Sequence, residues 1–183
     1  LPINILSKVF DPNPPDQVID AVESLEYRHV KLCVLYLNIP KLTGNASVYF
    51  PESKYPFNRI YEPKNRSKKM APKNKTCIVV ETSLGRNDIS SFPSNEEYYN
   101  KIKKCLIEES FIQKDDIINY DVGFIPNAYP ILNKGIQEKI KPALTYFSSF
   151  ENHLLHGRNA QFQYVHTHDL LKKSKEIIHQ LIS

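Results

Sequence analysis

The sequence predicts an α+β fold, with a mixed or antiparallel sheet of about five or six strands and flanking helices. Three observations lead to this class. Strand-like runs with period-two or continuous apolar residues gather between residues 28 and 132. Helical periodicities lie before, between and after these runs. From about residue 149 the sequence pattern predicts a strand, a loop and a helix, which would form part of an incomplete α/β layer.

The first elements are a short helix and a long strand. Asn13, two prolines and Asp16 supply an N-cap, a first-turn proline and a first-turn acid, which predicts a helix over 14–26. The period then changes, because apolar residues alternate and afterwards run continuously, and this predicts a strand over 28–38. Pro40 ends that strand.

The remaining elements are predicted from periodicity and from the residues that interrupt it. Ser94 and Glu97 form a capping-box pattern that opens a helix to about residue 110, and Pro126 with Asn127 suits a turn between two strands. The other predicted elements are strands at 47–50, 57–61, 76–83, 115–124, 128–132 and 154–157, and helices at 134–149 and 167–182.

The glycines exclude several function classes. There are five in the chain, and no two lie closer than twelve positions. Loops that cradle phosphates need clustered glycines, so the chain holds no GxGxxG fingerprint, no P-loop and no kinase glycine-rich loop. A dinucleotide site of the Rossmann type therefore cannot be built by these residues alone.

Apolar runs and cysteines in the sequence indicate whether the chain spans a membrane and in which compartment it resides. No apolar run approaches the ~18 residues of a membrane span, and no signal peptide is visible, so no membrane span is predicted. The three cysteines are odd in number and far apart, and two of them lie in apolar, strand-like runs. Buried, reduced thiols are the expectation, which favours a reducing compartment and a cytoplasmic localisation.

A basic loop, residues 62–75, holds six Lys or Arg residues and one acid, Glu62. The charge permits a nucleic-acid patch, but the loop accompanies no RNA-binding or zinc-knuckle signature. A solvated loop is the preferred interpretation, and no nucleic-acid partner is predicted.

Histidines are concentrated near the C-terminus, with His153, His156, His166, His168 and Asp169 within seventeen residues. His166 and His168 would share one face of a strand, as two metal ligands can. No HExxH pattern and no cysteine pair accompanies them, so surface histidines are preferred and no metal site is predicted. A Ser-His-Asp hydrolase is disfavoured because the chain lacks a GxSxG elbow.

The most distinctive stretch runs from His156 to Tyr164, where a predicted strand meets Gly157-Arg158, an aromatic loop and then a helix start. Backbone N–H groups at such a helix start suit a ligand with delocalised negative charge.

Several segments, taken in order, resemble the C-terminal half of flavin-dependent amine-oxidase-like proteins, the group that contains protoporphyrinogen oxidase. UDP-galactopyranose mutase is a more distant relative in this resemblance. Each motif alone is weak, and the specificity lies in their order and spacing over about residues 20–182. The matching segments are AVESLEYRHV from Ala21, VYFPE from Val48, YPFNRI from Tyr55, MAP from Met70, IVVE from Ile78, NAYPI from Asn127 and GRNAQFQY from Gly157.

The resemblance implies two parts, a substrate-binding-like α+β domain at 1–148 and a C-terminal segment of an FAD-binding domain at 149–183. In the family the loop after Gly-Arg lies beside the flavin, and the last helix directs its N-terminus at the flavin edge that becomes anionic on reduction. It thus implies FAD as cofactor, with Gly157, Arg158, Tyr164 and Thr167 on the cofactor side.

On the substrate side we expect Arg59, whose guanidinium can grip a carboxylate or phosphate, and Tyr129, which can stack or donate a hydrogen bond. No catalytic residue is assigned. The first functional hypothesis is a C-terminal fragment of an FAD-dependent oxidoreductase that positions a small-molecule substrate for hydride transfer to flavin N5. The alternatives are a UDP-galactopyranose-mutase-like flavoenzyme and a non-catalytic binding module.

The chain starts at Leu1 and its only methionine is Met70, so we expect a fragment of a longer enzyme. An N-terminal FAD domain of the same protein is the expected partner. The fragment by itself is expected to be inactive and to bind no FAD.

Overall fold

The computed structural model describes residues 1–182 and shows the predicted α+β fold, with one five-stranded antiparallel sheet and five α-helices. The described residues fall into two compact units. The sheet unit is Arg28–Ala128, and the helical unit combines Leu1–Tyr27 with the chain from Tyr129 onward. The boundary between residues 148 and 149, which the family resemblance implies, concerns membership of an FAD domain and stays a prediction.

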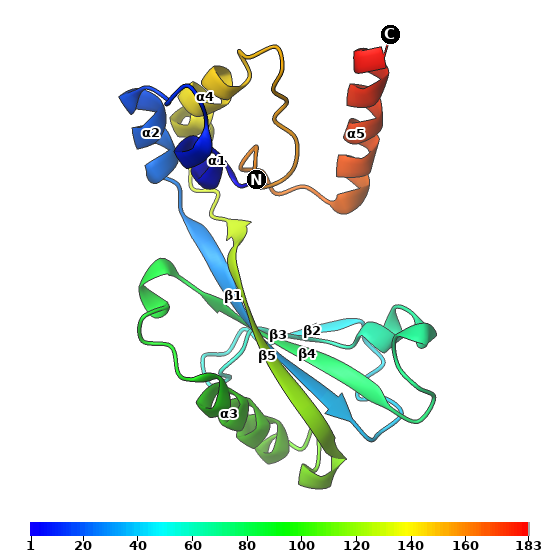
Figure 1. Ribbon diagram of the computed structural model, residues 1–183. Helices are drawn as coiled ribbons and strands as arrows, with labels where there is room; N and C mark the ends of the chain where they lie inside the picture. The colour runs from blue at the N-terminus through cyan, green and yellow to red at the C-terminus, as the bar shows by residue number, and fades with distance from the viewer. Residues whose placement is uncertain (183) are drawn as a thin grey trace. The chain divides into compact units, whose positions relative to one another are not determined.

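The sheet has the strand order β2-β3-β4-β1-β5, and α3 packs on one of its faces (Figure 1). The elements of this unit are β1 (Tyr27–Leu37), β2 (Ser47–Tyr49), β3 (Arg59–Tyr61), β4 (Thr76–Leu84), α3 (Asn95–Glu108) and β5 (Ile117–Pro130). Predicted strands at 28–38, 47–50, 57–61 and 76–83 thus match β1 to β4 within two residues at either end.

Period-two alternation explains which face of the sheet is buried. Cys33 lies opposite Val80 and Leu35 lies opposite Ile78 across the antiparallel β1–β4 ladder. All four side chains are fully buried in one hydrophobic cluster. Three α3 residues complete that cluster, at the helical spacing of four: Tyr98, Ile102 and Leu106. Burial raises the pKa of Cys33 to about 12, so this thiol stays protonated.

The capping box at the start of α3 is confirmed. The Ser94 hydroxyl accepts a hydrogen bond from the Glu97 amide at 3.2 Å, and the Glu97 carboxylate accepts one from the Ser94 amide at 2.9 Å. The contacts with Ser94 lower the pKa of Glu97. Two donors at the helix end, which have no partner within the helix, are satisfied in this way.

Ser94→Ala is therefore expected to lower the free energy of unfolding by about 1 kcal/mol, the usual effect of removing an N-cap hydroxyl. Urea unfolding followed by circular dichroism measures this change. Ser53→Ala, in an exposed turn, is the matched control and should leave stability within about 0.5 kcal/mol of the parent. Equal losses in the two variants would contradict a capping role for Ser94.

The two strands predicted at 115–124 and 128–132 are wrong as separate elements, because β5 runs unbroken from Ile117 to Pro130. Pro126 is tolerated because β5 lies at one edge of the sheet, where a missing N–H breaks no ladder bond on the outer side. Asn127 takes the left-handed conformation at φ 50°, and its amide donates to Nδ1 of His29 at 3.1 Å. The turn signal thus falls on a residue with left-handed backbone conformation inside a continuous strand.

The helical unit holds α1 (Ile3–Val9), α2 (Asp16–Glu23), α4 (Ile136–Phe147) and α5 (Thr167–Ile182). Figure 1 shows α2 beside α4, and their contact builds the core of this unit. The sequence did not predict α1, and the helix predicted at 134–149 is α4, which continues through Pro142. The most buried core residues are Ile3, Val22, Ile140, Ala143, Phe147 and Phe162.

The strand predicted at 154–157 is wrong, since this segment forms no strand in the structure. Strand formation needs a neighbouring strand to supply the ladder, and the five described strands all pair with one another in the single sheet β2-β3-β4-β1-β5. The helix predicted at 167–182 is confirmed as α5, and none of its residues is buried among residues 1–182. Of the helices that the structure describes, none has the length and hydropathy to cross a bilayer.

Candidate functional site

Three of the predicted site residues meet in the helical unit. The Arg158 guanidinium carbon lies 4.9 Å from the ring centroid of Tyr129 and 5.3 Å from that of Tyr164. The two tyrosine rings are 6.1 Å apart, centroid to centroid. We call these residues the Arg158 cluster. Each cation–π contact contributes about 0.5–1 kcal/mol at a partly exposed site, so the rings restrain the orientation of the guanidinium.

The backbone before Arg158 needs glycine for its conformation. Gly157 has φ of 108°, which L-residues rarely adopt, and a Cβ added there would meet no atom within 4 Å. Its carbonyl accepts from the Gln161 amide at 3.0 Å, and the Arg158 carbonyl accepts from the Gln163 amide at 2.9 Å. These two bonds close a tight loop that presents Arg158.

Phe162 anchors this loop in the core of the helical unit. Its side chain is fully buried, and its ring packs edge-on against Tyr27 at 5.1 Å. Phe162 also has φ of 49°, a strained value for a residue with a side chain, which the burial of its ring has to offset. Tyr164, two residues further on, is 58% exposed. The loop therefore buries the ring of Phe162 in the core and leaves the ring of Tyr164 exposed to solvent.

Within two positions of Arg158 in the sequence, two acceptor atoms are buried without a hydrogen-bond partner among the described residues, Nδ1 of His156 and Oδ1 of Asn159. The Ser174 hydroxyl donates to the Leu170 carbonyl at 2.9 Å, so the 2.7 Å contact between His156 and Ser174 requires Nε2–H to donate. Nδ1 of the neutral ring then carries a lone pair and no hydrogen, so it can only accept a hydrogen bond. Since buried polar atoms are normally paired, both atoms suit a ligand that carries N–H or O–H donors.

Thr167, the fourth predicted cofactor residue, is the first residue of α5. His166 and His168 on either side of it stack with centroids 5.5 Å apart, and the ring of Tyr164 is 6.3 Å from that of His166. Within residues 1–182, no group of three or more His, Cys, Asp or Glu side chains is arranged to hold a metal ion.

Arg59 lies in the sheet unit, apart in the chain from the Arg158 cluster. Its Nε and one terminal nitrogen donate to the two carboxylate oxygens of Glu81, each at 2.7 Å, and the pair is directly opposed across β3 and β4. The rings of Tyr49 and Tyr61 lie 5.8 and 5.3 Å from the guanidinium carbon. This ion pair holds the guanidinium plane in place.

Four residues around these groups were not predicted from the sequence: Glu81, Tyr49, Tyr61 and Phe162. Alternation along β3 could have shown that Arg59 and Tyr61 share a face, because they are two residues apart. The pairing with Glu81 depends on strand register across 22 residues, which no local pattern supplies. Phe162 is buried in a cluster that includes Tyr27, which is far away in the chain, so no local pattern could have predicted its burial.

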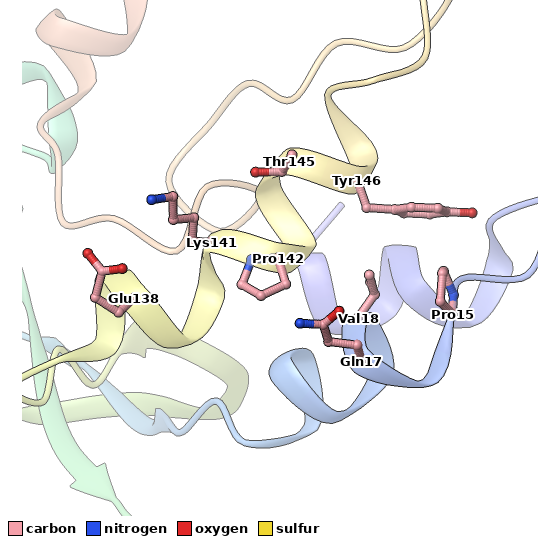
Figure 2. A pocket seen from close by; sticks show the side chains of 8 residues that line it. All are labelled: Pro15, Gln17, Val18, Glu138, Lys141, Pro142, Thr145 and Tyr146. Carbon is pink, nitrogen blue, oxygen red and sulfur yellow. The ribbon is translucent and has the colours of Figure 1, made fainter.

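A groove with a volume of about 440 Å³ lies between α2 and α4 (Figure 2). Pro15, Val18, Pro142 and Tyr146 supply its apolar surface, and Glu138 and Lys141 lie at the α4 side. None of the predicted site residues lines it.

Comparison with known families gives a match to the model described as GLF: UDP-galactopyranose mutase, over residues 4–115. The chain belongs to this mutase family. A comparison with curated proteins gives no match. The predicted resemblance to flavin amine-oxidase-like proteins, with the mutases as relatives, is thereby confirmed, and the family is one of flavoenzymes.

Two solved structures share the fold. A reduced UDP-galactopyranose mutase superposes with a TM-score of 0.70 at 19% identity, over 90% of this chain and 35% of that one. A putative protoporphyrinogen oxidase from Exiguobacterium sp. 255-15 gives 0.62 at 8% identity, over 87% and 35%. The chain thus spans about a third of the length of either protein.

Proposed function

We propose that the chain forms the substrate side and a flavin-facing loop of an FAD-dependent enzyme. The observations that support this most are the Arg158 cluster and the two buried acceptor atoms without donors on the nearby loop residues His156 and Asn159. When bound, FAD would supply the hydride acceptor of an oxidoreductase or, in its reduced form, the nucleophile of a mutase. These groups fit such a ligand, because its ring carries N–H donors, its ribityl chain carries hydroxyls, and the ring becomes anionic on reduction.

In this proposal the residues near the flavin have separate roles. Arg158 stabilises delocalised negative charge, and the tyrosine rings keep its N–H edge oriented so that little reorganisation is needed. Nδ1 of His156 and Oδ1 of Asn159 accept hydrogen bonds from the ligand. Gly157 supplies the backbone turn, and Thr167 starts the helix whose N-terminal amides favour the same charge.

On the substrate side, Tyr129 offers a ring and a hydroxyl, and Arg59 offers a cation in a fixed plane. Because Glu81 already occupies one edge of Arg59, a substrate carboxylate or phosphate would share the guanidinium with this carboxylate or displace it. Arg59 therefore favours an anionic substrate that brings more than one negative oxygen.

The family match favours a mutase-type reaction on a nucleotide sugar, and the structural likeness to a putative protoporphyrinogen oxidase supports hydride transfer as the second candidate. Two assays distinguish these candidate reactions. Both use a polypeptide that joins these residues to a flavin domain. Dithionite-reduced enzyme is incubated with UDP-galactopyranose and the products are resolved by chromatography, while oxidised enzyme is mixed with a porphyrinogen and flavin bleaching is followed. Ring isomerisation without net redox change identifies a mutase, and anaerobic bleaching identifies an oxidoreductase.

Arg158→Ala tests the site itself. We expect the two-electron potential of bound flavin to shift negative by about 20–60 mV, since a charge-assisted contact worth about 1–3 kcal/mol is lost from the anionic reduced form. A dye-coupled redox titration measures the shift. Arg86→Ala, an exposed arginine of the sheet unit, is the control and should leave the potential unchanged. An unchanged potential in Arg158→Ala would remove Arg158 from the flavin site.

A further inference from the structure

The basic loop is held in one conformation by its own first lysine. Lys64 is half-buried, and its ammonium donates to four backbone carbonyls at 2.6–3.0 Å. The four carbonyls belong to Pro40, Pro72, Lys73 and Lys75. Because these contacts bring both ends of the loop to one point, the residues between them are presented on a fixed frame.

The other cations of the basic loop face solvent. Five are exposed, and within residues 1–182 none of them takes part in an ion pair. They are Arg66, Lys68, Lys69, Lys73 and Lys75. The sequence has no acid between residues 63 and 80, so nothing in this stretch neutralises them.

An apolar side chain stands among these charges. Met70 is 58% exposed and ends a single 3-10 turn, Lys68–Met70, directly after two of the lysines. Ala71 and Pro72 follow, so Met70 is the first of three consecutive residues with uncharged side chains. Cations around an exposed apolar side chain match the two layers of a lipid interface, where phosphates lie above the acyl chains.

We propose that the basic loop is a peripheral binding surface for anionic phospholipid bilayers. Five cations meet the negative surface, each contributing a factor of about 5 in partition coefficient, and Met70 enters the interface between them. This inference is independent of the flavin proposal, because it rests on residues of the sheet unit that carry no part of the Arg158 cluster.

The geometry favours lipid over nucleic acid. Residues 63–75 include no aromatic side chain on which a base could stack. The loop contains only two 3-10 turns of three residues each, so it offers no helix to enter a major groove. An exposed methionine adds nothing to phosphate binding, whereas it adds apolar contact in a membrane interface.

The test is vesicle co-sedimentation of the 183-residue chain with phosphatidylserine–phosphatidylcholine vesicles and with pure phosphatidylcholine vesicles. Binding should require phosphatidylserine and weaken steeply between 50 and 500 mM salt, roughly as screening of surface charges predicts. Lys68→Gln with Lys69→Gln should lower the partition coefficient about 25-fold, from two factors of about 5. Met70→Ser should lower it less, by a few-fold, and this loss should persist at high salt.

Lys101→Gln with Lys114→Gln is the matched control, because it removes the same charge from two other exposed lysines of the sheet unit. The control should bind vesicles within about two-fold of the parent. Equal losses in both double variants, or no binding to phosphatidylserine vesicles, would overturn the proposal. Displacement of the chain from vesicles by a stoichiometric short oligonucleotide would overturn it too, and would assign the loop to nucleic acid.

Discussion

Replacing Phe162 by alanine is expected to lower the free energy of unfolding of the helical unit by about 3–5 kcal/mol, the usual cost of emptying a buried phenylalanine site. The side chain is fully buried and packs edge-on against Tyr27. Ile3 in the same cluster is also fully buried, and its amide donates to the Asn159 carbonyl at 3.1 Å. The loop that carries Arg158 is thus attached to this core at two places.

The same change is expected to release the Arg158 cluster. Phe162 keeps a strained φ of 49° only because its ring is fixed in the core. Without the ring the backbone can relax to a negative φ, and the two loop bonds made by Gln161 and Gln163 would be lost. The contact of Arg158 with Tyr164 depends on that loop, so the Arg158 cluster should loosen as stability falls.

Urea unfolding and near-ultraviolet circular dichroism measure both effects, and tyrosine signals are visible because the chain holds 11 Tyr and no Trp. Phe162→Leu keeps most of the volume and should cost less than about half as much. Phe124→Ala, at a 42% exposed position of β5, is the control for loss of a phenylalanine. A loss in Phe162→Ala no greater than in Phe124→Ala would contradict the anchoring role.

Local signals in the sequence were sufficient for most of the sheet unit. Alternation predicted β1, a β-branched run predicted β4, and the Ser94–Glu97 pattern predicted the start of α3, since each of these signals acts within a few residues. The turn signal at Pro126 misled because an edge strand tolerates proline, and edge position is a property of the assembled sheet.

The candidate site shows the same division between local and long-range information. Gly157-Arg158 and Tyr164 were predicted from a short stretch, and the structure brings Tyr129 to them from the end of β5. The unpartnered lone pair of His156 could not be predicted, because it follows from the direction of the hydrogen bond with Ser174, eighteen residues away. For the same reason, the pairing of Arg59 with Glu81 needed the register of β3 against β4.

Glu62→Gln is the second substitution with a large expected effect, and it should destabilise the sheet unit by several kcal/mol, since a hydrogen bond to a charged group contributes about 1.5–3 kcal/mol. The Glu62 side chain is fully buried and accepts hydrogen bonds from the Leu42 and Thr43 amides at 3.0–3.2 Å. It also accepts from the Asn65 side chain at 3.0 Å and from the Thr76 hydroxyl at 2.6 Å. Every neighbour is a donor, so an amide nitrogen in place of one oxygen would face donors with its own hydrogens.

The loss should spread beyond residue 62, because these bonds join the loop after β1, the start of β4 and the residue that follows β3. Arg59 lies on β3, so the ion pair with Glu81 should loosen in Glu62→Gln. Burial first, and the charge of Glu62 second, raise the pKa of Cys77, so removing the charge should speed thiolate alkylation there at fixed pH. Urea unfolding and alkylation rates are compared with Glu52→Gln, an exposed carboxylate, which should change neither. Unfolding of Glu62→Gln at the urea midpoint of the parent would show that the buried carboxylate does not hold these segments together.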